Sequence, residues 1–218
     1  MDNNSVHNVV VTGFGLFRGH KLNPSWEAIK DGRLKIDLPN IRIITQQVDV
    51  SYEAVDRIVE QLWEQYKPIL IVHVGLAAHE KSIRIEQVAR RGPYIHDDVV
   101  QNAPHKELRE YAEAEQGTVV NFTCKPCSFE SSRTCFDIDL ICDKLNEMHS
   151  SGVTSIPFKK SDDAGLYVCE YIYQKSLSIC DRVVFIHVPD IENFRLEDIT
   201  KSIECTIKLL LEQYNTVD

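Results

Sequence analysis

Short apolar runs and amphipathic stretches alternate along most of the chain. Residues 9–12, 41–48 and 69–75 read as three strand-like runs, and the first and third are strongly apolar and bounded by polar residues, Gly or Pro, a pattern typical of buried β-strands. Between the last two runs, apolar residues recur every three or four positions over residues 51–66, which predicts a helix. A further helix should begin near residue 23, where Asn23 can cap it and Pro24 fits the first turn.

The second half of the chain repeats this alternation. The spacing of apolar residues predicts helices and strands in the order helix 138–148, strand 154–158, a helix that begins near Ala164, strand 182–188 and helix 196–214. Strands that alternate with helices form a mainly parallel sheet covered on both faces. We therefore expect an α/β fold, a single three-layer α/β/α domain with a twisted central sheet that spans residues 1–218.

Two stretches depart from the alternation. Residues 1–7 are expected to form a disordered tail. Residues 82–133 are expected to contain a hairpin and long loops, with an irregular loop region over residues 90–133. Loops of that length in a compact domain are often functional.

Composition narrows the class of protein. The 218 residues are 43% hydrophobic and 26% charged, as in ordinary soluble domains. A net charge of −9 argues against nucleic acid or an anionic membrane as a partner. Seven cysteines, an odd number, follow an N-terminus without signal-peptide features, so we expect reduced thiols and a cytoplasmic location. The oligomeric state stays open between monomer and homo-oligomer.

Cys169 is the first candidate for chemistry, because it follows a predicted loop-to-helix transition. His187 ends an apolar strand 18 residues later, at the edge of a parallel sheet where ligands bind. Since a helix dipole acts mainly within the first turn, the imidazole should supply most of the activation and leave the thiol ionised at neutral pH. The alternatives are a buried structural cysteine and a core histidine, and His73 occupies a strand position similar to that of His187.

Glu86 is the candidate for a third catalytic role. A carboxylate bonded to an imidazole fixes its tautomer and stabilises the imidazolium. Glu86 lies among alternating apolar residues, however, and spacing alone equally fits the solvated face of a strand.

Two other motifs suggest different chemistry. Residues 12–19 follow the first strand as a glycine-rich turn, but Phe14, Leu16 and Phe17 crowd the space that a pyrophosphate needs, and Asp49 is the nearest candidate for a ribose contact. A small, flat, uncharged ligand suits this turn better. The pair Cys124 and Cys127, with Cys135 and Cys142 beyond it, is too weak a pattern to predict a zinc site, so we expect no metal.

Six blocks together resemble one known family. These are TGFGLF (12–17), NPSW (23–26), HVG (73–75), IRIEQVA (83–89), SDDAGLYVCEYIY (161–173) and FIHVP (185–189). In this order and spacing, from about residue 9 to residue 213, they resemble the pyroglutamyl-peptidase I family of cysteine peptidases, also called pyrrolidone carboxyl peptidases.

The resemblance implies hydrolysis of the amide bond after an N-terminal pyroglutamyl (5-oxoproline) residue of peptides, without a cofactor. It implies that Cys169 is the nucleophile, His187 the general base and acid, and Glu86 the residue that orients the imidazole. The substrate-binding residues that it implies are Phe14, Phe17, Asn23, Tyr167 and Val168.

The chain also departs from the family pattern. Many members have Gly-Arg where this chain has His79-Glu80, and bacterial members read Ala-Ile-Asn where it has Ala89-Arg90-Arg91. Residues 93–129 have no match in bacterial members. These departures bear on substrate preference and rate rather than on the chemistry, because all three triad positions are occupied. They also motivate an alternative, a catalytically silent protein that binds pyroglutamyl or related peptide termini.

Overall fold

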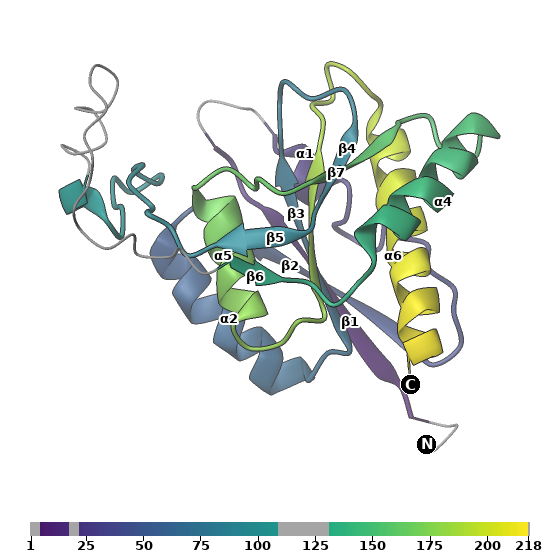
Figure 1. Cartoon of the computed structure of the whole chain (residues 1–218), viewed down its shortest axis with the longest axis horizontal. Coiled ribbons are helices and arrows are strands. Elements are labelled where there is room, and N and C mark those ends of the chain that lie inside the picture. Colours follow the sequence, from purple (N-terminus) through teal and green to yellow (C-terminus); the bar gives the residue numbers. More distant parts are fainter. Residues whose placement is uncertain (1–4, 18–21, 109–130, 218) are drawn as a thin grey trace.

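The computed structural model describes residues 5–17, 22–108 and 131–217 (Figure 1). Its centre is a six-stranded sheet in the order β2-β1-β3-β8-β4-β7, in which every neighbouring pair is parallel except β4 and β8. The strands are β1 (His7–Phe14), β2 (Ile41–Val48), β3 (Leu70–Leu76), β4 (Ile83–Glu86), β7 (Phe158–Ser161) and β8 (Val183–Val188). The predicted fold class, α/β with a mainly parallel sheet, is confirmed.

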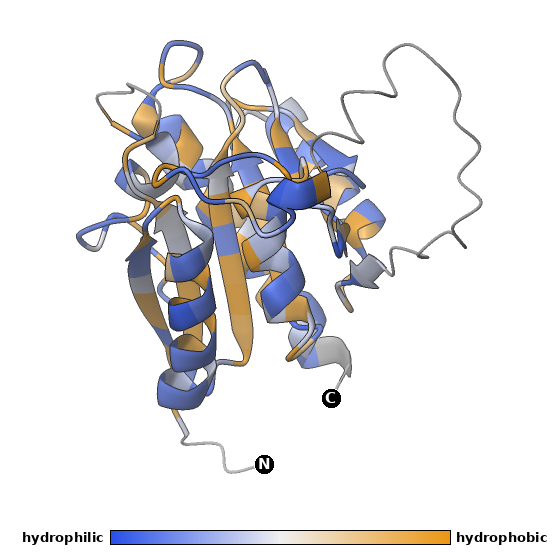
Figure 2. Cartoon of the chain, turned by 90° about the vertical axis from the view of Figure 1, so that its left-hand side faces the viewer, coloured by the Kyte–Doolittle hydropathy of each residue, from blue (hydrophilic) through white to orange (hydrophobic). Residues whose placement is uncertain are grey.

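Helices cover both faces of the sheet. The helices are α1 (Pro24–Glu27), α2 (Tyr52–Tyr66), α4 (Ile138–Ser150), α5 (Val168–Leu177) and α6 (Leu196–Val217). One core cluster joins α2 and α5 to strand residues such as Ile71 and Phe185, and a second joins α1, α4 and α6 to alternate residues such as Val72 and Val184. Because successive strand side chains point to opposite faces, a strand buried on both faces reads as a continuous apolar run. Figure 2 shows such a hydrophobic central strand between helices with hydrophilic outer sides.

Several helix starts follow from capping residues. The side-chain oxygens of Asn23, Ser51 and Asp137 accept bonds from backbone N–H groups in the first turns of α1, α2 and α4. For α5 the predicted start near Ala164 is wrong, because the helix begins at Val168. Gly165 and Leu166 have φ angles of 94° and 40°, in the left-handed region that a helix cannot include.

Residues 82–133 differ from the expected hairpin. The segment 83–86 is β4, which lies inside the main sheet between β7 and β8. The next strand, β5 (Val88–Arg90), pairs instead with β6 (Ser131–Arg133) in a separate antiparallel sheet. The strand expected at residues 154–158 is β7, which begins at the last of these residues.

The loop region after β5 and the N-terminal tail are described in part. Residues 91–105 contain no helix or strand, and a short 3₁₀ turn, η1 (Lys106–Leu108), follows. Residues 109–130, with Cys124 and Cys127, and residues 1–4 of the predicted tail lie outside the described residues. The part of the tail that is described leads into β1, which begins at His7. Across the described ranges, no helix has both the length and the apolar character needed to cross a membrane.

Candidate active site

Strand pairing brings Glu86 and His187 together. In the antiparallel β4–β8 pair, Glu86 lies opposite Phe185 and Arg84 lies opposite His187. Paired residues, and residues two apart on one strand, point to the same face of a sheet, so all four side chains share the face covered by α5. There the Nδ1 atom of His187 lies 2.8 Å from Oε1 of Glu86. Glu86 is fully buried and His187 is 6% exposed.

Cys169 lies on the same face, in the first turn of α5. Gly75 on β3 is the sheet partner of His187, and a Cβ atom added to Gly75 would lie 3.1 Å from the Cys169 sulfur and 2.7 Å from the Phe185 ring. The sulfur therefore packs directly over Gly75, and the backbone of His187 lies one strand spacing, about 4.8 Å, to the side. The structure thus brings together all three residues predicted to be catalytic.

The charge state of Cys169 differs from the expectation. Burial and the nearby negative charge of Glu86 raise the pKa of the Cys169 thiol to about 12, although a backbone hydrogen bond acts in the opposite direction. Cys169 keeps partial contact with solvent. The raised pKa favours the neutral thiol and runs against the predicted thiolate. A thiol in this state has to lose its proton before or during any nucleophilic attack.

His73, the competing histidine, has a structural environment. Its Nδ1 lies 2.8 Å from the Thr12 hydroxyl and its Nε2 lies 2.8 Å from the Ser176 hydroxyl. Full burial lowers the pKa of His73 to about 3, so the ring stays neutral and links β1, β3 and α5. Because both ring nitrogens are engaged, His73 does not compete with His187 for the sulfur.

Asn23 shapes the turn after β1. Its side-chain nitrogen donates to the Gly15 carbonyl over 2.8 Å, and its oxygen accepts from the backbone N–H and hydroxyl of Ser25. Gly13 permits this close packing, because a Cβ atom there would lie 2.4 Å from the Ser25 carbonyl oxygen. Asn23 therefore fixes the backbone of the turn that carries Phe14 and Phe17.

The four predicted ring-binding residues form two layers. Phe14 and Val168 are buried members of the core cluster beneath α5. Phe17 and Tyr167 are partly exposed, and their ring centroids lie 5.7 Å apart. The Tyr167 hydroxyl also donates to the backbone carbonyl of Asp97, which ties residues 94–102 to the start of α5.

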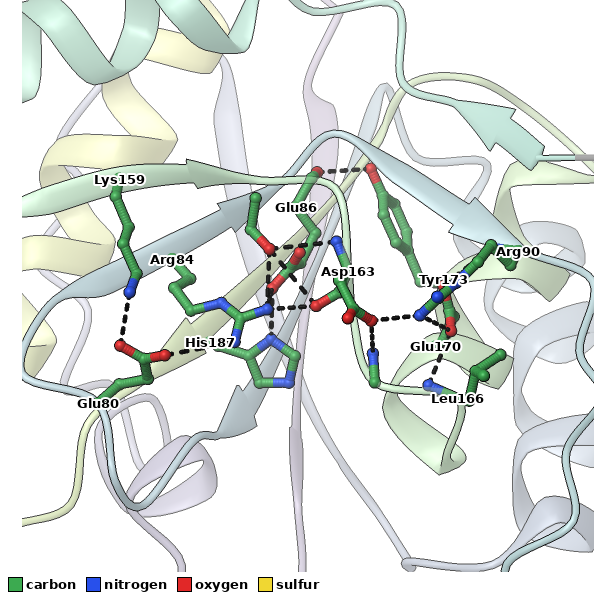
Figure 3. Close-up of polar contacts among 12 residues, drawn as sticks. Glu80, Arg84, Glu86, Arg90, Lys159, Asp163, Leu166, Glu170, Tyr173 and His187 are labelled. Atoms are coloured by element: carbon green, nitrogen blue, oxygen red, sulfur yellow. Dashed lines mark hydrogen bonds and ion pairs between the residues drawn. The ribbon is translucent and has the colours of Figure 1, made fainter. Parts of the chain in front are cut away.

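Three charged residues at the site were not predicted. An Nη2 atom of Arg84 lies 3.0 Å from Glu86 Oε1 (Figure 3). Arg90 bonds both carboxylate oxygens of buried Glu170, over 3.0 and 3.1 Å, and Glu170 also accepts from the Leu166 N–H. The sequence signal for the Arg84–Glu86 contact was their spacing, two residues apart on one strand. The same spacing also fitted a strand face exposed to solvent.

The site has the components of a cysteine peptidase. A thiol at a helix start, an imidazole on a nearby strand and a carboxylate bonded to one ring nitrogen match the arrangement of nucleophile, base and orienting group in acyl-transfer enzymes. Within the described residues, no group of three or more His, Cys, Asp or Glu side chains is arranged to hold a metal ion. The fold and the site thus define the class as a cysteine-type hydrolase.

Comparison with known proteins identifies the family. The model of the pyroglutamyl peptidase family matches residues 7–211. Pyroglutamyl-peptidase 1 of Homo sapiens is 27% identical over 207 residues, which cover 94% of this chain and 90% of the relative. Pyrrolidone-carboxylate peptidase of Vibrio campbellii is 32% identical over 192 residues, which cover 83% and 77%. The chain therefore belongs to the pyroglutamyl peptidase family of cysteine-type omega peptidases.

Solved structures agree in fold. A mutant pyrrolidone carboxyl peptidase of Pyrococcus furiosus superimposes with a TM-score of 0.71 at 24% identity, covering 94% of this chain and 98% of that one. Pyroglutamyl peptidase I of Bacillus amyloliquefaciens gives a TM-score of 0.69 at 24% identity, covering 96% and 95%. The α/β arrangement is therefore shared along nearly the whole chain.

Proposed function

We propose that this chain hydrolyses the amide bond after an N-terminal pyroglutamyl residue of peptides, with Cys169 as nucleophile, His187 as general base and acid, and Glu86 as the orienting carboxylate. The family match supports the reaction. The observation that carries the residue roles is the 2.8 Å contact between Glu86 and His187, on the sheet face where the Cys169 sulfur packs. The catalytically silent alternative has no support from the comparisons.

Proton transfer and attack are coupled in this mechanism. Because Nδ1 of His187 is held by Glu86, the free Nε2 is the atom that takes the thiol proton. As the proton leaves, the Cys169 sulfur attacks the pyroglutamyl carbonyl, and Glu86 stabilises the imidazolium that forms. His187 then protonates the departing amine, and a thioester remains on Cys169. Finally, His187 activates a water molecule, which hydrolyses the thioester and restores the thiol.

The start of α5 supplies donors for the oxyanion. The first N–H groups of a helix have no carbonyl partner inside the helix. The side chain of the N-cap residue Tyr167 is directed to Asp97 rather than to these groups. We propose the N–H groups of Val168 and Cys169 as oxyanion donors, a role in which loss of one donor costs about 10²–10³ in kcat.

The ring of the substrate is neutral and flat. We propose that Phe17 and Tyr167 flank it at the surface, that buried Phe14 and Val168 form the apolar floor, and that Asn23 holds the turn in place. An apolar pocket disfavours the charged amine of an ordinary N-terminal residue, because that charge would lose its hydration. The pocket should therefore select the lactam over N-terminal glutamate.

The proposed partners and cellular location rest on the family match, the net charge and the free cysteines. Pyroglutamyl peptides are the proposed substrates. The predicted lack of nucleic-acid binding rests on the net charge of −9. The proposed cytoplasmic location is supported by the free thiols of the five cysteines in the described part of the chain.

Replacement of the nucleophile tests this proposal. Cys169→Ala should abolish release of a fluorescent amine from its pyroglutamyl amide, because no other group can form the thioester. Cys180→Ala is the matched control, since Cys180 is a partly exposed free thiol three residues beyond the end of α5. It should keep wild-type turnover. Turnover by folded Cys169→Ala at the wild-type rate would refute the assignment.

A further inference from the structure

Arg84 contacts the carboxylate that orients the proposed base. Its Nη2 lies 3.0 Å from Glu86 Oε1, the same oxygen that lies 2.8 Å from Nδ1 of His187. Among the described residues, none bonds to the second oxygen, Oε2. Both the cation and the imidazole therefore act on one carboxylate oxygen.

The charge balance of this contact depends on the state of His187. Glu86 is fully buried, and an isolated carboxylate in that position would be costly. Among the described residues, the permanent cation in direct contact with the Glu86 carboxylate is the guanidinium of Arg84, whereas a base such as His187 gains and loses its proton during the proposed reaction. The Tyr173 hydroxyl donates to the backbone carbonyl of Glu86 rather than to its carboxylate. Arg84 thus holds the charge of Glu86 between proton transfers.

Arg84 is itself fixed by its surroundings (Figure 3). Its Nη2 donates to the Ser161 hydroxyl over 2.8 Å and to the backbone carbonyl of Asp163. Its Nη1 lies 3.4 Å from Glu80, whose other oxygen lies 2.7 Å from the Lys159 ammonium. These cations hold the pKa of Glu80 below its usual range, so Glu80 stays charged. Opposite charges therefore alternate from Lys159 through Glu80 and Arg84 to Glu86.

We propose that Arg84 is a positioning residue of the reaction: it balances the charge of the Glu86 carboxylate and holds that carboxylate oriented toward His187, and it acts through Glu86. The inference rests on the proposed Glu86, His187 and Cys169 roles. The proposal also gives a role to one departure from the family pattern. Many members have Gly-Arg where this chain has His79-Glu80, and here Glu80 is an ion-pair partner of Arg84. Loss of Arg84 should lower kcat, because Glu86 and His187 act in the bond-making steps, and should leave KM within about twofold.

A double-mutant cycle with Glu86 tests this directly. Arg84→Met should lower kcat by about tenfold to a hundredfold, the loss expected for one charge-assisted hydrogen bond. In a Glu86→Gln background the same substitution should cost less than about twofold, because the charge on which Arg84 acts is absent. Arg84→Lys should retain part of the activity, since it keeps the charge but loses the forked geometry. Each is assayed with a pyroglutamyl amide, with thermal unfolding to confirm the fold.

The controls separate this inference from the proposed function. Arg42→Met removes an exposed arginine on edge strand β2 and should leave kcat unchanged. An equal loss from Arg84→Met with and without Glu86 would overturn the inference, as would wild-type kcat in Arg84→Met. If Arg84→Met does not fold, Arg84→Lys takes its place in the cycle. The loss of kcat that Arg84→Lys causes in the wild type must then disappear in the Glu86→Gln background. Wild-type kcat in Glu86→Gln alone would instead refute the triad.

Discussion

The two buried histidines of this sheet show that contacts, rather than residue type, decide a side chain's role. His73 and His187 lie on adjacent parallel strands and face the same side. His187 contacts a carboxylate and lies beside a thiol, so it can carry a proton during a reaction. His73 contacts two hydroxyl groups in a fully buried site, so it stays neutral. The sequence around each reads as a histidine within an apolar strand.

The lowered pKa of His73 predicts a dependence of stability on pH. The pKa is about 3 in the folded chain and about 6.5 in the unfolded chain, so the unfolded chain binds more protons between these values. The contribution of His73 to stability is complete above pH 6.5 and decreases as the pH falls toward 3. At pH 5 the loss should be about 2 kcal/mol relative to pH 7.5.

Urea unfolding at the two pH values measures this contribution. In His73→Asn the free energy of unfolding should change less between pH 7.5 and pH 5 than in the wild type, by about 2 kcal/mol. This holds even if the variant is less stable at both pH values. His79→Asn removes an exposed histidine and should preserve the wild-type difference. An unchanged difference in His73→Asn would mean that the ring is protonated in the folded protein.

At the scale of elements, the site depends on where α5 begins and on which strands pair. The helix begins at Val168, so Cys169 lies in the first turn, where the helix dipole favours a developing thiolate. The left-handed backbone at Gly165 and Leu166 and the extended backbone at Tyr167 exclude these residues from the helix. With this start, the helix contributes to activation of Cys169 together with the imidazole.

Gly75 is where strand β3 makes room for the nucleophile. A methyl group at this position would lie 2.7 Å from the Phe185 ring and 3.1 Å from the Cys169 sulfur. Gly75→Ala should therefore displace the sulfur, lower kcat by at least about tenfold and destabilise the fold by about 1–3 kcal/mol. Steady-state kinetics with a pyroglutamyl amide and urea unfolding measure the two effects.

Gly152→Ala is the matched control for this prediction. Gly152 has a φ angle of 79° after α4, and apart from its two chain neighbours no atom of the described residues lies within 4 Å of an added Cβ. The substitution should lower stability through backbone strain and leave kcat unchanged. Equal kcat values for Gly75→Ala and the wild type would show that the sulfur does not depend on this packing.

For the whole molecule, the predictable parts are those that local patterns specify. β1, β3 and β8 are buried strands with largely apolar sequences, and they were predicted to within about one or two residues. β7 carries the polar sequence Lys159-Lys160-Ser161 at the sheet edge, and β5 and β6 pair across 40 intervening residues, so neither follows from periodicity. The proposed triad residues were indicated by motif. Arg84 is two residues from Glu86, but local spacing does not show that Glu86 is buried, and the Arg90–Glu170 pair joins residues 80 positions apart.

The central claim is that the sulfur of Cys169, with His187 beside it, attacks a pyroglutamyl carbonyl. A pyroglutamyl chloromethyl ketone, which carries the substrate's ring and alkylates a nearby nucleophile, tests this claim most directly when the modified residue is located by peptide mass spectrometry. We predict that activity is lost in proportion to the labelling of Cys169 and that excess pyroglutamyl amide protects the thiol. Complete inactivation with Cys169 unmodified would contradict the account.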